Sequence, residues 1–292
     1  MSSIIKSKID GSANYVTKEA IGYVEARFVR RVPDYFSVYL SSQTGCNRGC
    51  RFCHLTTTKQ TKFIDLDANE ILDQAEKILA HYHDLLAHNG IPAKQVHFNF
   101  MARGEPLHNK HILTQGTSLL MRLGMLAFNA GLHPKFNVST ILPDDMANMR
   151  LIDVFPIVTP TIYYSIYSIN QQWRNKWLPT AKNVYEALDD LALYQYTTKK
   201  IIKFHCAFIK DENDNLDDVQ MMMRAIKVRG IFGEFNIVRY NPYSPEYGEE
   251  TSDTQLNRIA GLIREYMPVK FIPRVDPKTY GSCGMFVEKT FA

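Results

Sequence analysis

The sequence predicts an α/β fold in which a parallel sheet curves into a barrel or a partial barrel. Strand-like apolar runs alternate with helical patterns along most of the chain. This repeated strand-then-helix order brings successive strands into parallel alignment. The 292 residues, 45% of them hydrophobic and 12% aromatic, also suffice for one large core. We expect a core domain over residues 36–292, preceded by an N-terminal extension or hairpin over residues 1–35.

Seven segments have the apolar character expected of barrel strands. They are residues 36–42, 95–101, 136–141, 161–165, 201–209, 234–240 and 269–274. Ahead of them, the segment 22–32 alternates in character and predicts an extra strand or hairpin packed against the barrel. We find no internal repeat and no linker long enough to separate domains.

Capping residues mark where several helices begin. Asp67 is suited to an N-cap, and Glu70 stands three residues later in the capping-box position. The apolar stripe that follows comprises Ile71, Leu72, Ala75, Ile78, Leu79 and Tyr82. Ser252 and Gln255 repeat this pattern before a second stripe, made of Leu256, Ile259, Ile263 and Tyr266. A third helix is predicted over residues 216–228.

Three cysteines in one short loop carry the strongest chemical signal. Cys46, Cys50 and Cys53 follow the first predicted barrel strand, and an aromatic residue, Phe52, precedes the third. Three thiolates can ligate three irons of a four-iron, four-sulfur cluster and leave the fourth iron open. Zinc is the alternative, but a structural zinc site needs four ligands and no second cysteine pair is present. We interpret His54, the next residue, as a loop residue.

Two further motifs lie at ends of predicted strands, where the chemistry of such folds is located. A Gly104-Glu105-Pro106 turn exposes backbone and a carboxylate suited to an ammonium group. Cys283 lies between glycines near the C-terminus, as either a small buried residue or a thiol on a loop that must move.

The composition says more about the cellular compartment of the protein than about its binding partners. The net charge of +4 is compatible with nucleic acid but does not indicate it. No apolar run is long enough for a membrane span, and the first residues have no signal-peptide core. Five cysteines, an odd number, argue against a secreted disulfide framework. Because a cluster needs reducing surroundings, we expect a cytoplasmic protein without a membrane partner.

The three motifs, in this order, resemble the RlmN/Cfr family of radical S-adenosylmethionine (AdoMet, SAM) RNA methyltransferases. The likeness continues through residues 41–46, 138–140, 165–167, 174–179 and 240–243. It implies a partial (β/α)6-type radical SAM barrel that binds a 4Fe-4S cluster and S-adenosyl-L-methionine. It also implies methylation of an adenine carbon (C2 or C8) in rRNA or tRNA, with an electron donor such as flavodoxin or ferredoxin.

Residue matching to this family implies a role for each motif. Cys46, Cys50 and Cys53 would hold the cluster, and Cys283 would carry the methyl group. Glu25 falls where the family has a proposed proton acceptor, although a solvated strand position is the alternative. The AdoMet site would be lined by Phe52, Gly104, Glu105, Ser139, Ser165, Ile166, Tyr167 and Asn241.

The chain departs from the family pattern in two places. Tyr39 stands where the family has a second cysteine, whose thiolate attacks the sulfur that joins protein and product. Cys206 could replace it, although a core cysteine is the interpretation we favour. The family also carries an N-terminal accessory domain that we expect to be missing here. Two alternatives therefore stay open: a radical SAM enzyme with a non-RNA substrate, and a non-catalytic iron–sulfur protein.

Basic and aromatic side chains do not decide between these alternatives. Arg27, Arg30 and Arg31 cluster near the predicted hairpin, where phosphate contacts and solvated charges explain them equally well. Trp173 and Trp177 have helical spacing, and we expect them to pack in the core rather than stack on bases.

Overall fold

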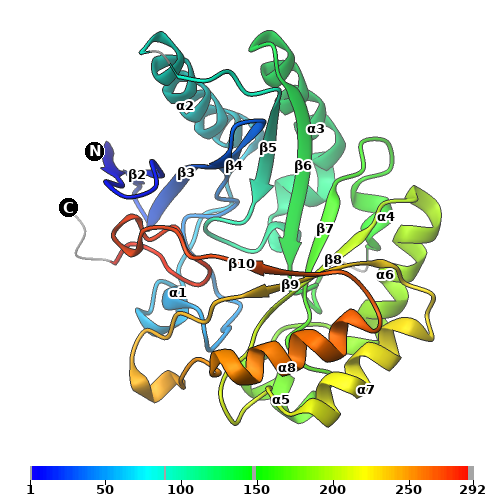
Figure 1. Cartoon of the computed structure of the whole chain (residues 1–292). Helices are drawn as coiled ribbons and strands as arrows, with labels where there is room; N and C mark the ends of the chain where they lie inside the picture. Colours follow the sequence, from blue (N-terminus) through cyan, green and yellow to red (C-terminus); the bar gives the residue numbers. More distant parts are fainter. Residues whose placement is uncertain (1, 89, 147–148, 289–292) are drawn as a thin grey trace.

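One curved sheet runs through the whole chain (Figure 1). The computed structural model describes residues 2–88, 90–146 and 149–288. In these residues the sheet follows the sequence order from β1 to β10. The strands are β1 (Ser2–Lys6), β2 (Ala13–Lys18), β3 (Tyr23–Val32), β4 (Tyr35–Tyr39), β5 (Gln95–Phe100), β6 (His133–Thr140), β7 (Thr161–Ser165), β8 (Ile202–Ala207), β9 (Gly233–Val238) and β10 (Val269–Ile272).

The direction of the strands divides this sheet into two parts. β4 to β10 pair in parallel, and each of the seven predicted barrel segments overlaps one of them. β1 to β3 pair antiparallel and join the barrel at β4. The α/β partial barrel with an N-terminal hairpin is thereby confirmed, with β1 and β10 as its open edges. The domain division at residue 35 stays a prediction, and residues 289–292 lie outside the described residues.

Helices connect the parallel strands and lie on the outside of the sheet (Figure 1). The α-helices are α1 (His54–Thr57), α2 (Ala68–Ala87), α3 (Lys110–Asn129), α4 (Leu151–Val154), α5 (Gln171–Trp177), α6 (Val184–Thr198), α7 (Leu216–Lys227) and α8 (Asp253–Arg264). Three short 3-10 turns are η1 (Pro106–His108), η2 (Pro245–Tyr247) and η3 (Pro277–Thr279). No helix of the described residues is both long and apolar enough to span a membrane.

The predicted caps are confirmed at both helices. Asp67 accepts hydrogen bonds from the backbone N–H groups of Asn69 and Glu70, and the Glu70 side chain completes the capping box of α2. Ser252 accepts from the Gln255 N–H at the start of α8. That helix ends at Arg264, so the predicted stripe extends two residues too far, to Tyr266.

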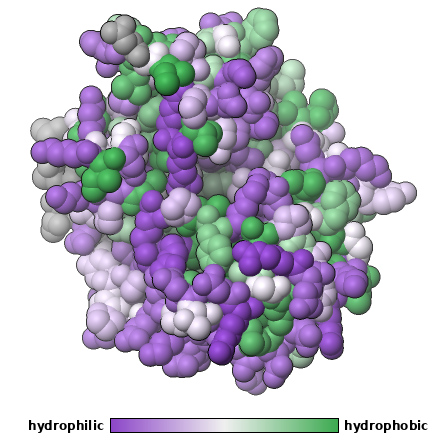
Figure 2. Space-filling view, in the orientation of Figure 1, coloured by the Kyte–Doolittle hydropathy of each residue, from purple (hydrophilic) through white to green (hydrophobic). Residues whose placement is uncertain are grey.

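Strand alternation separates the core side chains from those that line the barrel interior. On β8, Phe204 and Cys206 are buried in the core, whereas His205 between them lines a cavity inside the barrel. Trp173 and Trp177 are also buried, which confirms that they pack in the core. On the face seen in Figure 2, hydrophobic side chains are interspersed among hydrophilic ones. The curved sheet surrounds a cavity that polar and apolar side chains line together.

Candidate active site

The cysteine loop lies between β4 and α2, at the carboxyl end of β4. Cys46, Cys50 and Cys53 are half-buried and line one cavity together with Gly104 and Glu105. Backbone hydrogen bonds fix the loop, because the Cys53 N–H donates to the Cys50 carbonyl at 3.0 Å. The fold thus brings the first two sequence motifs to one place.

The three thiols form a donor set that fits an iron–sulfur cluster. Burial raises the pKa of Cys46 to about 12 and that of Cys53 to about 11. Burial, followed by repulsion from Cys46 and Cys53, raises the pKa of Cys50 further. A bound cationic cluster would displace these protons. No group of three His, Cys, Asp or Glu side chains in the described residues lies close enough together to hold a single metal ion.

Glu105 follows β5 and offers a buried carboxyl group next to the cysteines. Its Oε1 accepts from the Leu107 N–H at 3.1 Å, and its Oε2 accepts from the Ile141 N–H at 3.1 Å. Burial raises the pKa of Glu105 to about 7 despite these hydrogen bonds. A carboxyl group in this state gains most from a cationic partner, as an ammonium group would be.

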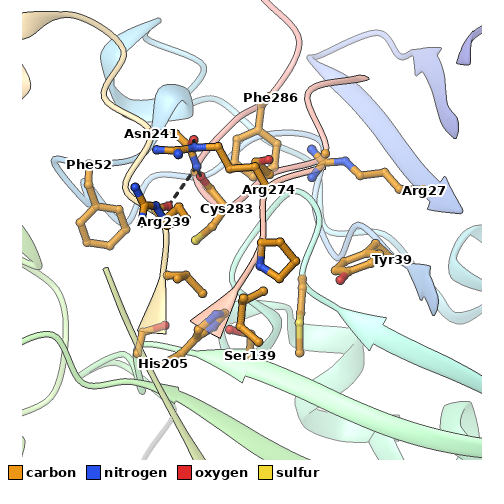
Figure 3. Close-up of a pocket in the computed structure, with 18 of the residues that line it drawn as sticks. Arg27, Tyr39, Phe52, Ser139, His205, Arg239, Asn241, Arg274, Cys283 and Phe286 are labelled. Carbon is orange, nitrogen blue, oxygen red and sulfur yellow. Dashed lines mark hydrogen bonds between the residues drawn. The ribbon is translucent and has the colours of Figure 1, made fainter. Parts of the chain in front are cut away.

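A second cavity holds Cys283 and adjoins the first (Figure 3). Cys283 lies on the loop that follows β10, and its side chain is exposed to this cavity. The two cavities share several lining residues, namely Phe52, Met101, Ser139, Ile141, Ser165, Gly284 and Phe286. The third sequence motif is therefore continuous with the cysteine loop and the Glu105 turn.

Tyr167 fixes the Cys283 thiol against the cysteine loop. Its ring stacks on Phe52 with 4.3 Å between ring centroids and an interplanar angle of 11°. Its hydroxyl donates a hydrogen bond to the Cys283 thiol. Burial raises the pKa of Cys283, although this hydrogen bond opposes the shift. At neutral pH Cys283 is accordingly a positioned thiol rather than a free thiolate.

Backbone contacts hold the Cys283 loop in place on both sides. The Asn241 side-chain amide donates to the Cys283 carbonyl at 2.9 Å. The His54 N–H donates to the Gly284 carbonyl at 3.0 Å, which ties the loop to the start of α1. Gly284 has a φ of 79°, a conformation that favours glycine and lets the loop turn back toward the cysteines. His54 is the first residue of α1, so the prediction that it is a loop residue is wrong, and its N–H supports the Cys283 loop.

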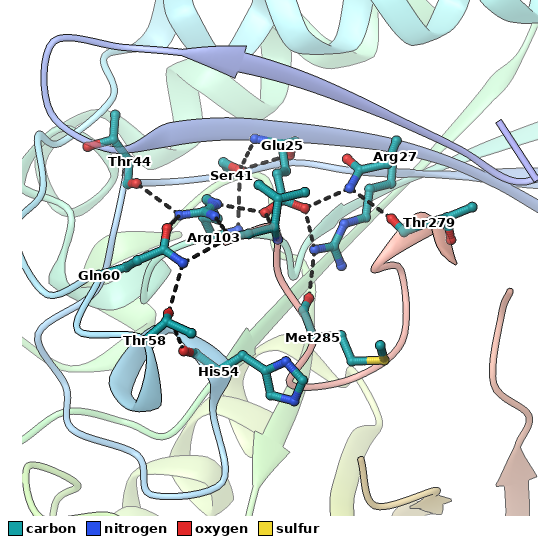
Figure 4. A network of polar contacts seen from close by, with 12 residues as sticks. Glu25, Arg27, Ser41, Thr44, His54, Thr58, Gln60, Arg103, Thr279 and Met285 are labelled. Carbon is teal, nitrogen blue, oxygen red and sulfur yellow. Dashed lines mark hydrogen bonds and ion pairs between the residues drawn. The ribbon is translucent and has the colours of Figure 1, made fainter. Parts of the chain in front are cut away.

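Glu25 is not among the described residues that line either cavity. It is fully buried, so the alternative of a solvated strand position is wrong. Its carboxylate pairs with Arg103 at 2.7 Å and Arg27 at 2.8 Å (Figure 4). Burial would raise the pKa of Glu25, but the two guanidinium groups outweigh it and lower this pKa. The Val287 N–H also donates to Glu25, which anchors the C-terminal segment.

The remaining predicted residues divide between cavity and core. Ser139, Ser165 and Asn241 line the Cys283 cavity, whereas Ile166 is fully buried and is not among its described lining residues. Tyr39 lines the same cavity as Cys283. Cys206 is fully buried and contacts the Tyr167 and Ala207 carbonyl oxygens at 3.7 and 3.6 Å, which confirms a core cysteine.

Three residues of the Cys283 cavity were missed by the sequence interpretation. His205 lies near the end of β8, Arg239 follows β9 and Arg274 follows β10 (Figure 3). Their position at the carboxyl ends of parallel strands was the available signal. Burial lowers the pKa of His205 to about 4, so its imidazole is neutral at pH 7.

Sequence comparison identifies relatives along most of the chain. No family model matches it. A protein of Synechococcus sp. (strain RCC307) named "Probable dual-specificity RNA methyltransferase RlmN" is 27% identical over 80% of the chain and 63% of its own length. The RlmN of Chelativorans sp. (strain BNC1) is 28% identical over 79% of the chain and 56% of its own length. The chain thus spans less than two thirds of these relatives.

Structural comparison defines the class of fold. A radical SAM methyltransferase from Sphaerobacter thermophilus superposes with a TM-score of 0.75 and 18% identity, covering 97% of this chain and 80% of that one. Methylornithine synthase superposes with a TM-score of 0.51 and 10% identity, covering 81% and 64%. The fold is that of the radical SAM enzymes. Within this class, the curated relatives confirm the resemblance to RlmN that the motifs predicted.

Proposed function

We propose that this chain is a radical SAM methyltransferase that modifies an adenine carbon, C2 or C8, in RNA. Cys46, Cys50 and Cys53 would hold a 4Fe-4S cluster, with AdoMet beside it. When bound, the reduced cluster supplies the electron that splits AdoMet into methionine and a 5′-deoxyadenosyl radical. We place the protein in the cytoplasm, where flavodoxin or ferredoxin can donate that electron.

One observation carries this proposal: the Cys283 cavity is continuous with the cavity of the three cysteines. Phe52, Ser139 and Ser165 line both. A methyl group on the Cys283 sulfur would therefore lie next to the place where AdoMet is cleaved. The Tyr167 hydroxyl orients that sulfur, and the Glu105 carboxyl is suited to the ammonium group of AdoMet. This proximity is what hydrogen abstraction from an S-methyl group requires.

Tyr39 favours a second candidate, a radical SAM enzyme with a non-RNA substrate. It lines the Cys283 cavity at the position where the family has its second cysteine. A phenol cannot attack sulfur to release a product as a disulfide. Cys206 does not supply the missing thiolate, because burial raises its pKa well above the ordinary value and its side chain packs in the core. The two candidates share AdoMet cleavage and differ in the use of Cys283.

The test is an anaerobic assay on cluster-reconstituted protein with dithionite, AdoMet and bulk RNA. We expect 5′-deoxyadenosine, one added methyl group on the Cys283 peptide by mass spectrometry, and methyladenosine in digested RNA. Cys283→Ala should still cleave AdoMet but should not methylate RNA. Cys50→Ala should neither cleave AdoMet nor methylate RNA. Cys206→Ala is the matched control and should methylate RNA as the unaltered chain does.

The outcomes separate the candidates. An unmodified Cys283 alongside AdoMet cleavage would favour the non-RNA enzyme. An intact cluster that yields no 5′-deoxyadenosine would overturn both and favour a non-catalytic iron–sulfur protein.

A further inference from the structure

Four arginines line the cavity that contains Cys283. Arg27 and Arg31 come from β3, Arg239 follows β9 and Arg274 follows β10. Figure 3 shows Arg27 on one side of Cys283 and Arg239 on the other. The arginines come from distant parts of the sequence, so their meeting is a property of the fold. A cavity lined by one sign of charge concentrates ligands of the opposite sign.

The described residues that line this cavity include no aspartate and no glutamate. The carboxylates that pair with three of the arginines lie behind them. Glu25 pairs with Arg27, and Glu250 pairs with Arg239 at 2.8 Å and with Arg274 at 3.0 Å. These ion pairs hold the guanidinium groups in position but place no negative charge at the cavity wall.

Arg31 differs from the other three, because it makes no ion pair within the described part of the chain. Its side chain is exposed, and its Nη2 donates to the Pro273 carbonyl at 3.0 Å. This contact leaves the other guanidinium N–H groups available to a ligand. Arg31 is thus a charged donor that the Pro273 carbonyl, just after β10, holds at the rim of the cavity.

Arg27 supplies a second, independent sign of a missing ligand. Its side chain is only 3% exposed, yet its Nε has no hydrogen-bond partner among the described residues. A buried N–H without an acceptor is costly, so such groups normally have a partner in the functional state. An anionic oxygen in the cavity would provide that partner.

We propose that Arg31, with Arg27 behind it, binds a backbone phosphate next to the nucleotide that enters the Cys283 cavity. This inference rests on the proposed function and specifies how that site recognises its substrate. A planar guanidinium matches two phosphate oxygens at once, which fixes the register of the strand without reading its sequence. The target base would then face Cys283 while its phosphate stays at the rim.

The carboxylate of AdoMet is the other anion to consider. The four arginines are not among the described residues lining the cavity of the three cysteines, where Glu105 lies. A ligand that contacts Arg31 therefore lies in the Cys283 cavity and away from Glu105. Because the arginines and Glu105 lie in different cavities, an experiment can distinguish an RNA phosphate from the AdoMet carboxylate.

The experiment compares Arg31→Gln with Arg30→Gln in the reconstituted protein. Arg30 is the neighbouring residue on β3, and its guanidinium donates to the Ile91 carbonyl at 2.7 Å, away from the Cys283 cavity. Both variants remove one positive charge, so the pair controls for general attraction. The probe is a fluorescein-labelled single-stranded RNA of mixed sequence, titrated at several salt concentrations.

We expect Arg31→Gln to weaken RNA binding by about tenfold, as loss of a charged hydrogen bond does. It should also reduce the slope of log K against log salt by about 0.7, the value for one phosphate on a single strand. Arg30→Gln should leave both quantities close to those of the unaltered chain. Formation of 5′-deoxyadenosine without RNA should be unchanged in Arg30→Gln.

Three results would overturn this inference. Equal RNA binding by Arg31→Gln and the unaltered chain would remove the phosphate contact. Equal weakening of RNA binding by both variants would show that Arg31 acts only through nonspecific electrostatic attraction. Loss of AdoMet cleavage in Arg31→Gln alone would assign Arg31 to the AdoMet carboxylate. The methyl group on Cys283 is measured separately and tests the proposed function. Failure of the proposed function is therefore distinguishable from failure of the Arg31 inference.

Discussion

Glu25 organises the polar interior at the scale of a single residue. Its Oε2 accepts from Arg27 and from the Asn14 amide at 2.7 Å, and its Oε1 accepts from Arg103 and the Val287 N–H. With four donors on two oxygens and a lowered pKa, this carboxylate is a weak proton acceptor. The contacts are those of a positioning residue for the Cys283 loop, and its predicted catalytic role stays untested.

Substitution of Glu25 should show this structural role. Glu25→Gln leaves Arg27 and Arg103 buried without a counter-charge, and breaking a buried pair costs about 3–5 kcal/mol. We expect the free energy of unfolding in urea to fall by that amount. Glu76→Gln, on the exposed face of α2, is the control and should change it by less than about 0.5 kcal/mol. Equal stability of the two variants would show that the Glu25 ion pairs contribute little.

The lowered pKa of Glu25 also fixes the sign of a pH dependence. A carboxyl group whose pKa is lower in the folded chain stabilises it above the unfolded pKa, which is about 4.3 for glutamate. That stabilisation is lost as pH falls through the folded pKa. The unfolding free energy of the unaltered chain should therefore decline more steeply with acidification than that of Glu25→Gln. Parallel pH profiles would contradict this linkage.

At the scale of elements, apolar periodicity predicted the centres of strands better than their ends. β7 occupies the predicted residues 161–165, where buried Ile162 and Tyr164 alternate with half-buried residues. β6 begins at His133, earlier than predicted, because its first residues are partly exposed and pair with β5. β1 was not predicted, since three of its five residues are exposed and its pairing with β2 defines it. Strand pairing across the sheet is invisible in a local pattern.

The turn after β5 gives a prediction for an element. Gly104 has a φ of 94°, and a Cβ there would lie 2.6 Å from the Ser42 Oγ and 2.8 Å from the Gln43 N. Gly104→Ala should shift the turn that presents Glu105, and should weaken AdoMet binding by about tenfold or more. The iron content of the reconstituted protein should be unchanged. Isothermal titration calorimetry measures the AdoMet affinity, and iron analysis measures the iron content.

Gly261→Ala is the matched control for this turn. Gly261 lies in α8, and a Cβ there meets no atom within 4 Å. Because alanine is the better helix former, this variant should gain about 0.5–1 kcal/mol of stability and keep its AdoMet affinity. Equal AdoMet affinity in both variants would show that the Gly104 turn tolerates a side chain.

At the scale of the whole molecule, the order of the motifs predicted that they meet in one site but not which contacts hold them together. The spacing of three cysteines and the strand-end turn were readable because each is local. Arg103 joins Glu25, the Gln60 side chain and the Val287 carbonyl, which are 78, 43 and 184 residues away (Figure 4). No local pattern marks such a contact, because a buried arginine and a solvated one look alike in sequence. The meeting of Arg27 and Arg31 with Arg239 and Arg274 in the Cys283 cavity was not predicted for the same reason.

The complete fold also brings Tyr39, from β4, into one cavity with Cys283, from the C-terminal loop. If a methylene group joins the Cys283 sulfur to an adenine carbon, release requires a nucleophile that attacks this sulfur. Burial raises the pKa of Tyr39, which keeps its phenol protonated, and a phenol makes no bond to sulfur here. Release from the unaltered chain should therefore be slow, so that part of the modified RNA accumulates as a covalent RNA–protein adduct, visible as a shifted band on a denaturing gel.

Tyr39→Cys should relieve this block. The new thiolate would attack the Cys283 sulfur and form an S–S bond, while the carbon–sulfur bond breaks with its electron pair on the methylene carbon, which then takes a proton from water. Added dithiothreitol would reduce the disulfide and allow further turnovers. We expect less adduct and more free methylated RNA than with the unaltered chain. Tyr39→Phe, which changes the same position without adding a thiol, should keep the adduct. If both variants release methylated RNA equally, Tyr39 does not limit release and the cycle uses another route.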